Sequence, residues 1–205
     1  MADGIWRTQV VAGNTFNILF QEEEADCGPC CCAMIVNMID GSKPTSTSIQ
    51  SNMPQGAYAK STRDRSGFKP TIFHQVGLVA PDEYHSSGTY INALGHALAQ
   101  FGIANTPHGN DGTSLRKAMR SASSARPIIV LVQWHGGGGH WIVIAGSEHH
   151  RKGLFGGFRG YTRLTILDPY YGGTTLNGTS STYVSATREG SHGTGSFAPY
   201  WLQVD

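Results

Sequence analysis

Four residues, widely separated along the chain, carry the side chains that cysteine-based acyl transfer requires. Gln21 stands six residues before Cys27, and His140 and Asp168 follow far downstream. A cysteine attacks as a thiolate, so it needs a base to take its proton. A carboxylate can orient that base and stabilise its charged form, and a side-chain amide can donate to the oxyanion that attack creates. We therefore interpret Cys27 as nucleophile, His140 as base, Asp168 as its orienting partner and Gln21 as oxyanion donor.

The nucleophile is predicted to lie at the start of a helix. Asp26 suits the N-cap position, Pro29 suits the first turn, and the apolar run 30–39 is typical of a buried helix. Gly41 marks the expected end of this helix. A helix N-terminus offers free N–H groups and a partial positive charge, both of which favour a thiolate.

Two strands are predicted to carry the base and its partner. His140 follows four glycines and opens the apolar, β-branched run 140–145, whereas Asp168 directly follows the run 164–167. If these strands are neighbours, the carboxylate can reach the imidazole. Residues 147–160 are expected to form an extended hairpin tip, which accounts for the long separation between His140 and Asp168.

The rest of the pattern predicts helices followed by a sheet. Residues 9–11 and 16–20 are expected to be extended, and residues 41–86 to be rich in loops with short helices. Further helices are expected at 87–101 and 113–123, and further strands at 127–132, 182–187 and 199–204. This order indicates an α+β fold in one domain of 205 residues, with a helical half at about 22–125 and a sheet half at about 126–205. The site is expected between the helix of Cys27 and the strand of His140.

Four short blocks resemble the papain-like cysteine peptidases: Gln21, Asp26-Cys27-Gly28-Pro29, Gly139-His140-Trp141 and Asp168-Pro169. They are most similar to the peptidases that process bacteriocins and to the effector peptidases of plant pathogens. The resemblance implies a papain-like fold, in which a helix carrying the cysteine precedes an antiparallel sheet carrying the histidine and the aspartate. It also implies a secreted bacterial effector or toxin that acts on a target-cell protein and is neutralised by a cognate immunity protein.

Other activities share the same four groups. A glutamine deamidase or transglutaminase would attack a glutamine side-chain amide, and an amidohydrolase would cut the peptide stem of a cell wall. The triad does not separate these classes, because their chemistry is the same up to the thioester. A binding module built on a degenerate peptidase fold is a further alternative, and it predicts that at least one of the four groups is missing.

Each residue also has a structural alternative. Cys27 and His140 could be core residues, Asp168-Pro169 could simply open a turn, and Asn177 is the nearest alternative third member. Cys27-Gly28-Pro29-Cys30 is a Cys-x-x-Cys, which can bind zinc or exchange thiols. All four cysteines fall within residues 27–32, however, without a second ligand pair, so we expect no metal and no cofactor. Cys30, Cys31 and Cys32 are expected to pack inside the helix.

Composition narrows the function classes. The net charge of +1, with 14% charged residues, gives no reason to expect a nucleic-acid partner. No segment approaches the ~20 apolar residues of a membrane span. The first residues lack a basic-then-apolar signal, so we expect a cytoplasmic protein or delivery by a signal-independent secretion system. The expected partner is a protein or peptide substrate.

Overall fold

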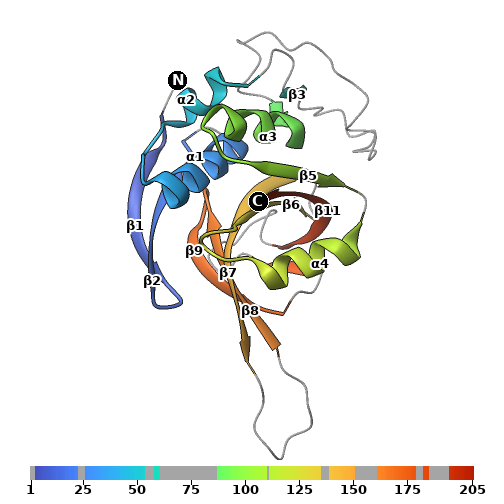
Figure 1. The fold of residues 1–205 in the computed structure, drawn as a ribbon. Coiled ribbons are helices and arrows are strands. Elements are labelled where there is room, and N and C mark those ends of the chain that lie inside the picture. The colour runs from blue at the N-terminus through green and yellow to red at the C-terminus, as the bar shows by residue number, and fades with distance from the viewer. Residues whose placement is uncertain are drawn as a thin grey trace, which may run out of the picture.

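The computed structural model contains helices and antiparallel strands in the part of the chain that it describes (Figure 1). That part comprises residues 3–22, 26–53, 58–60, 87–109, 111–134, 139–150, 161–178, 182–184 and 194–205. Its helices are α1 (Cys27–Asp40), α2 (Ser46–Ser51), α3 (Ile91–Gln100) and α4 (Gly112–Ser121). Its strands are β1 (Ile5–Val11), β2 (Asn14–Phe20), β3 (Tyr58–Lys60), β4 (Ser87–Thr89), β5 (Asn105–Gly109), β6 (Ile128–Trp134), β7 (Gly139–His150), β8 (Tyr161–Asp168), β9 (Gly172–Asn177), β10 (Thr182–Val184) and β11 (Thr194–Val204). The predicted α+β class is thereby confirmed.

A seven-stranded sheet forms the centre of the described part: six strands follow the order β10-β11-β6-β7-β8-β9, and the seventh, β5, pairs with β11. The long strand β11 pairs with β6 along one edge, and with β10 and then β5 along the other. β1 pairs with β2, and β3 with β4, in two separate two-stranded sheets. Every pairing is antiparallel, as predicted.

Helices cover both faces of the large sheet. Alternate residues of β6 and β7 point to opposite faces, as the two-residue repeat of a strand requires. Leu131, Trp141 and Val143 share one apolar core with α1 and α3. Val132 and Ile142 belong to a second core with α4. The chain is therefore layered, with α1 and α3 on one side of the sheet and α4 on the other.

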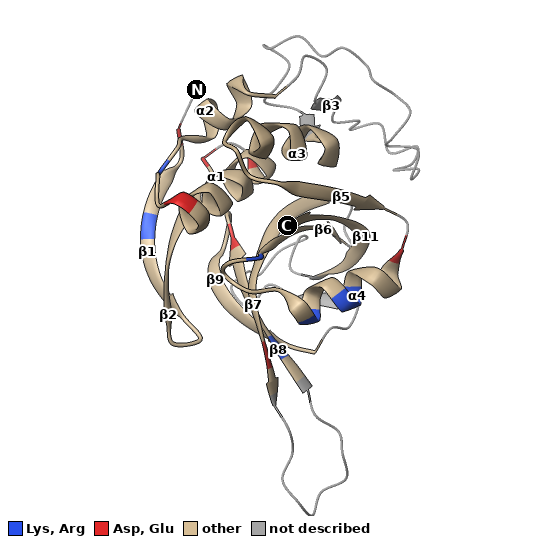
Figure 2. Ribbon diagram, in the orientation of Figure 1, with Lys and Arg blue, Asp and Glu red and all other residues tan. Residues whose placement is uncertain are grey.

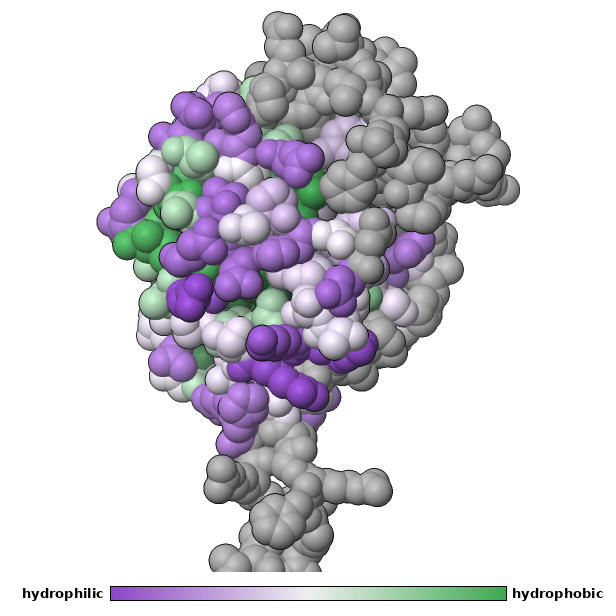
Figure 3. All heavy atoms as spheres, turned by 45° about the vertical axis from the view of Figure 1, so that its right-hand side comes forward, coloured by the Kyte–Doolittle hydropathy of each residue, from purple (hydrophilic) through white to green (hydrophobic). Residues whose placement is uncertain are grey.

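The exposed side of α4 carries basic residues. Arg116, Lys117 and Arg120 are exposed, while Leu115 and Met119 are buried against the sheet (Figure 2). Hydrophilic residues are spread over the face drawn in Figure 3, with the deepest purple in its lower half. The side of the molecule that carries α4 is separated from α1 by the sheet. Within the described residues, no helix has both the length and the apolar character needed to span a bilayer.

The three helices predicted individually are observed as α1, α3 and α4, but the predicted start of α3 is wrong. α1 ends at Gly41, which adopts the left-handed conformation with φ of 81°. Residues 87–89 were expected to begin a helix but form strand β4, and α3 starts at Ile91. β4 pairs with β3 through backbone hydrogen bonds, a long-range contact that local periodicity does not register.

The strand predictions are confirmed for β6, β7 and β8, but the sequence analysis did not predict β3, β4, β5 or β9 as strands. β9 lies in a stretch rich in Gly and Thr, and β5 contains a proline and two residues, Asn and Gly, that are uncommon in strands. Pairing with neighbouring strands stabilises both despite their weak intrinsic preference. The predicted strand 182–187 is observed as β10, and residues 185–187 lie outside the described part. The predicted strand 199–204 is the second half of the longer β11.

The β1–β2 hairpin packs closely on β9. The backbone N–H of Gly173 donates to Oε1 of Gln9 at 2.7 Å. A Cβ on Gly173 would lie 2.2 Å from Cγ2 of Val11, so only glycine permits this approach. The contact brings the end of β2, and Gln21 directly after it, to the turn that follows β8.

The turn of this hairpin contains a strained residue, which leads to a prediction about stability. Ala12 and Gly13 form a two-residue loop with φ of 50° and 79°, the pattern of a type I′ turn. Alanine is disfavoured in this left-handed region, whereas asparagine is tolerated. We expect Ala12→Asn to raise the free energy of unfolding by about 0.5–1 kcal/mol, measured by urea denaturation. Ala12→Val should lower it, and equal midpoints for both variants would contradict this account.

Candidate active site

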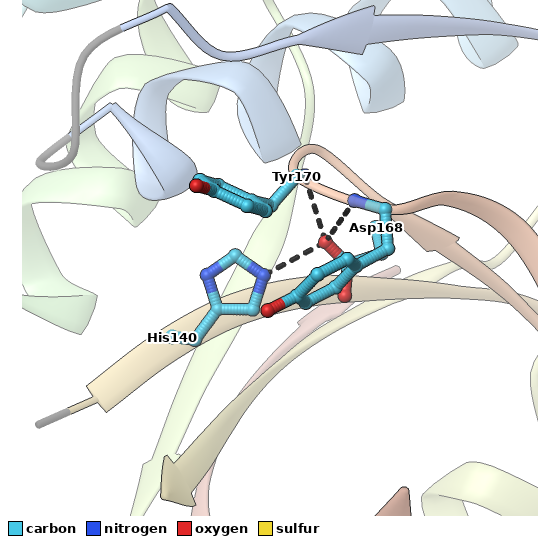
Figure 4. Close-up of polar contacts among 4 residues, drawn as sticks. His140, Asp168 and Tyr170 are labelled. Atoms are coloured by element: carbon cyan, nitrogen blue, oxygen red, sulfur yellow. Dashed lines mark hydrogen bonds and ion pairs between the residues drawn. The ribbon is translucent and has the colours of Figure 1, made fainter. Parts of the chain in front are cut away.

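A buried histidine–aspartate pair lies where β7 begins and β8 ends. These strands are antiparallel neighbours, so the start of one lies beside the end of the other. Nε2 of His140 is 2.8 Å from Oδ1 of Asp168 (Figure 4). His140 is 6% exposed and Asp168 is 0% exposed. The structure thus brings the predicted base and its predicted orienting residue into direct contact.

The turn after β8 holds the carboxylate in place. Oδ1 of Asp168 also accepts hydrogen bonds from the backbone N–H groups of Tyr170 at 2.7 Å and Tyr171 at 3.1 Å (Figure 4). An aspartate that caps a turn in this way is common in loops. Here the structural and the functional reading of Asp168 apply together, because the oxygen that caps the turn also contacts the imidazole.

The surroundings of His140 favour its charged form. Burial by itself lowers the pKa of His140, but the Asp168 charge, the Asp168 hydrogen bond and a hydrogen bond with Cys27 together raise that pKa to about 10. Because Nε2 faces Asp168, Nδ1 is the ring nitrogen that remains for the Cys27 thiol. The imidazole therefore has one nitrogen on Asp168 and leaves the other to Cys27, which is the arrangement that proton transfer from thiol to histidine requires.

Cys27 is the first residue of α1. Its side chain is 6% exposed. In the first turn of a helix the backbone N–H groups lack intrahelical partners and point toward the N-terminus. The Cys27 sulfur thus sits where these groups and the helix dipole stabilise negative charge.

The N-terminal turn of α1 is fixed by close packing. A Cβ on Gly28 would lie 2.9 Å from Cδ2 of Leu94 and 3.0 Å from Oγ1 of Thr89. The carbonyl of Thr89 accepts a hydrogen bond from Nε1 of Trp141 at 3.0 Å. Trp141 directly follows His140, so one set of contacts ties the nucleophile's helix to the strand of the base. This explains why glycine follows the cysteine.

Asp26 does not cap the helix in the predicted way. It occupies the N-cap position, but its side chain makes no capping hydrogen bond to the described first turn of α1. Its carboxylate instead accepts from Nε2 of Gln50 at 3.0 Å and from Oγ of Ser46 at 3.3 Å. Asp26 therefore anchors α2 against the start of α1. The sequence could not reveal this, because both partners lie at least 20 residues away.

Gln21 is held beside the same turn as Asp168. Its backbone N–H donates to the carbonyl of Pro169 at 2.8 Å. Its side chain is half-buried, with Oε1 shielded from solvent. The hairpin that ends at β2 thus delivers the predicted oxyanion donor to the neighbourhood of the histidine–aspartate pair.

Aromatic rings that sequence reasoning missed enclose His140. The ring of Trp134 stacks on the imidazole with centroids 5.6 Å apart, and Tyr171 approaches edge-on at 6.4 Å. Aromatic faces attract a cationic imidazole and exclude water from it. Trp134 ends β6 and Tyr171 follows the Asp-Pro turn. The only sequence signal for a role of these two aromatic residues is that each lies within a few residues of His140 or Asp168.

The remaining sequence candidates lie elsewhere. Asn177 pairs with Arg163 at the far end of β8, so it is not brought to His140. Cys30, Cys31 and Cys32 are each 0% exposed inside α1, as expected, and all four cysteines are free thiols. Among the described residues, no three His, Cys, Asp or Glu side chains are grouped as metal ligands.

The chain was also compared with known proteins. No protein-family model matches it, and no curated protein matches it either. The site is therefore interpreted from its own geometry.

Proposed function

We propose that the chain is a papain-like cysteine peptidase that hydrolyses peptide bonds through Cys27, His140 and Asp168, with Gln21 as oxyanion donor. The observation that supports this best is the bridging histidine. His140 contacts Asp168 through Nε2 at 2.8 Å, and Cys27 acts with Asp168 to raise the pKa of His140, although these residues come from three separate elements. Burying ionisable groups is costly, and strongly shifted pKa values cluster at functional sites, so this buried pair supports a catalytic role beyond the capping of the turn by Asp168.

The proposed reaction begins with proton transfer. The Cys27 thiol gives its proton to Nδ1 of His140, and Asp168 stabilises the resulting imidazolium. The Cys27 sulfur then attacks the substrate carbonyl carbon. The oxyanion accepts hydrogen bonds from the Gln21 side-chain amide and from the backbone N–H of Cys27.

The second half of the reaction regenerates the thiol. The tetrahedral intermediate collapses, the C–N bond breaks, and the imidazolium of His140 protonates the departing amine. A thioester with Cys27 remains. His140 then takes a proton from water, the hydroxide attacks the thioester, and Cys27 leaves as the thiol after reprotonation.

The test of this function compares wild type with Cys27→Ala on a proteome extract. New N-termini are read by mass spectrometry, and glutamine side chains are scanned for deamidation and crosslinks. N-termini that vanish in the variant would support a peptidase and reveal its cleavage sequence. Deamidation or crosslinks without new termini would move the chain to the deamidase or transglutaminase class. No Cys27-dependent change of any kind would contradict catalysis on proteins.

Gln21→Ala is expected to lower kcat by about 10²–10³-fold, because one donor to the oxyanion is lost. KM should change little, since this interaction forms mainly in the transition state. Steady-state kinetics on the first identified peptide substrate would measure both. Gln21→Glu is the matched control: it keeps the side-chain length but places negative charge beside the oxyanion, so its kcat should fall at least as far. A kcat unchanged in Gln21→Ala would remove Gln21 from the mechanism.

A further inference from the structure

Three cysteines behind the nucleophile have no part in the proposed peptidase mechanism. Cys30, Cys31 and Cys32 follow Cys27 on α1 and are each 0% exposed, whereas Cys27 is 6% exposed. Burial raises the pKa of Cys30 and of Cys31 well above their ordinary value. Cys30 and Cys31 therefore remain thiols at neutral pH, and an oxidant from solvent meets Cys27 first.

Helix geometry limits which of these thiols can bond to Cys27. In a regular helix the Cα atoms are about 5 Å apart for residues three apart, about 6 Å for four apart and about 9 Å for five apart. Disulfides require a Cα separation of roughly 4.4–6.8 Å. Cys30 and Cys31 are thus in range of Cys27, and Cys32 is out of range.

The first turn of α1 favours Cys30 over Cys31. Bringing two Cβ atoms to disulfide distance requires the turn between them to unwind. For the N–H groups from Cys27 to Cys30, the described residues provide one regular helical acceptor, the Asp26 carbonyl, which accepts from the Cys30 N–H at 2.9 Å. Pro29 has no N–H to lose, and the N–H of Gly28 lies in the first turn, where intrahelical acceptors are lacking. Reaching Cys31 would unwind the next turn as well.

We propose that Cys30 is a resolving thiol, which captures oxidised Cys27 as a reversible Cys27–Cys30 disulfide when the protein meets a peroxide. The ligand class is a small hydroperoxide such as hydrogen peroxide. The proposal rests on the positions of the two thiols and holds whether or not the chain is a peptidase. If the chain is a peptidase, the disulfide stores the nucleophile in an inactive form that a dithiol can restore.

The Cys27–Cys30 disulfide forms in two steps, oxidation of Cys27 and its capture by Cys30. The Cys27 sulfur attacks one peroxide oxygen, the O–O bond breaks, and sulfenic acid and one water form as sulfur loses two electrons. The Cys30 sulfur then attacks the Cys27 sulfur, the S–O bond breaks, and the thiol proton leaves with hydroxide as a second water. A dithiol such as dithiothreitol returns both cysteines to thiols by exchange.

The experiment maps thiols by two alkylation labels. Purified protein is treated with hydrogen peroxide and denatured, its free thiols are blocked with the first label, and it is then reduced and given the second label. Peptide fragmentation locates each label. In the wild type we expect two of the four thiols to carry the second label, at Cys27 and Cys30. A second label at Cys31 or Cys32, or at no cysteine, would overturn the proposal.

Two matched variants sharpen the test. Cys30→Ala and Cys32→Ala delete the same atoms from the same buried helix, and melting curves check whether each variant is folded. With peroxide, Cys30→Ala should convert Cys27 to sulfinic and sulfonic acids that dithiothreitol does not reverse, while Cys32→Ala should form the disulfide like wild type. Reversal in Cys30→Ala equal to that in Cys32→Ala would contradict a resolving role. The wild-type label map needs no variant, so it decides the matter even if Cys30→Ala does not fold.

Discussion

Replacing Cys27 by alanine is expected to lower the rate of amide hydrolysis by at least about 10⁴-fold, because no thioester can form without the nucleophile. Cys27→Ser should lose almost as much. Its hydroxyl can still contact His140, but serine is far harder to deprotonate than a thiol at neutral pH. The fold should survive both changes, since Cys27 lies at the first position of α1 and not among the fully buried cysteines.

The nucleophile can also be measured without a known substrate. A small thiol-reactive electrophile such as iodoacetamide, used on the folded protein near neutral pH, should label Cys27 faster than any other cysteine. Its rate should fall when His140 is replaced by alanine, because the base no longer accepts the thiol proton. Cys32→Ala is the control that should leave labelling at Cys27 unchanged. Equal labelling of all four cysteines would mean that Cys27 has no special environment.

Local signals in the sequence predicted the parts of the site that lie on regular elements. The apolar run after Cys27 and the glycine at position 41 define α1, because burial and a left-handed cap act within a few residues. The β-branched run after His140 and the run before Asp168 define two strands for similar reasons. The sequence analysis had to assume that these two strands are neighbours. The antiparallel pairing of β7 with β8 shows that they are.

Contacts between distant segments could not be predicted in the same way. Asp26 bonds to α2, Trp134 stacks on His140, and the hairpin before Gln21 rests on β9. None of these contacts produces a periodic pattern in the sequence, because each depends on how the elements pack together and not on the helix or strand propensity of either element. Gly173 is an example: its role against Val11 becomes visible only when the hairpin and β9 are placed together.

Substitutions of Asp168 can separate two of its effects on His140, the orientation of the imidazole ring and the stabilisation of its positive charge. Its Oδ1 atom accepts from His140 and from the N–H groups of Tyr170 and Tyr171. These two backbone donors require an oxygen at that position. In Asp168→Asn they should therefore hold the amide oxygen toward His140, so that Nε2 stays protonated and Nδ1 still faces Cys27. Asp168→Ala removes the acceptor altogether.

We accordingly expect Asp168→Asn to lower kcat by only about 10-fold and Asp168→Ala by about 10³–10⁴-fold, the range found when the histidine is no longer oriented. The two variants should also differ from wild type in pH dependence. The proposed active form carries a proton on His140, so activity falls as pH rises through the pKa of that residue, about 10. Without the Asp168 charge this pKa drops, and the alkaline limb of the rate profile should move to lower pH by at least about one unit in both variants.

The raised pKa of His140 also makes the stability of the fold depend on pH. The pKa of His140 is raised above its ordinary 6.5, so the stabilisation from charging it is fully present below pH 6.5 and is lost as pH rises through about 10. Urea denaturation of wild type should therefore show falling stability across that window, and Asp168→Asn should show a smaller fall. Equal kcat in the two Asp168 variants would mean that the turn does not fix the amide. An unmoved alkaline limb would mean that Asp168 does not govern the protonation of His140.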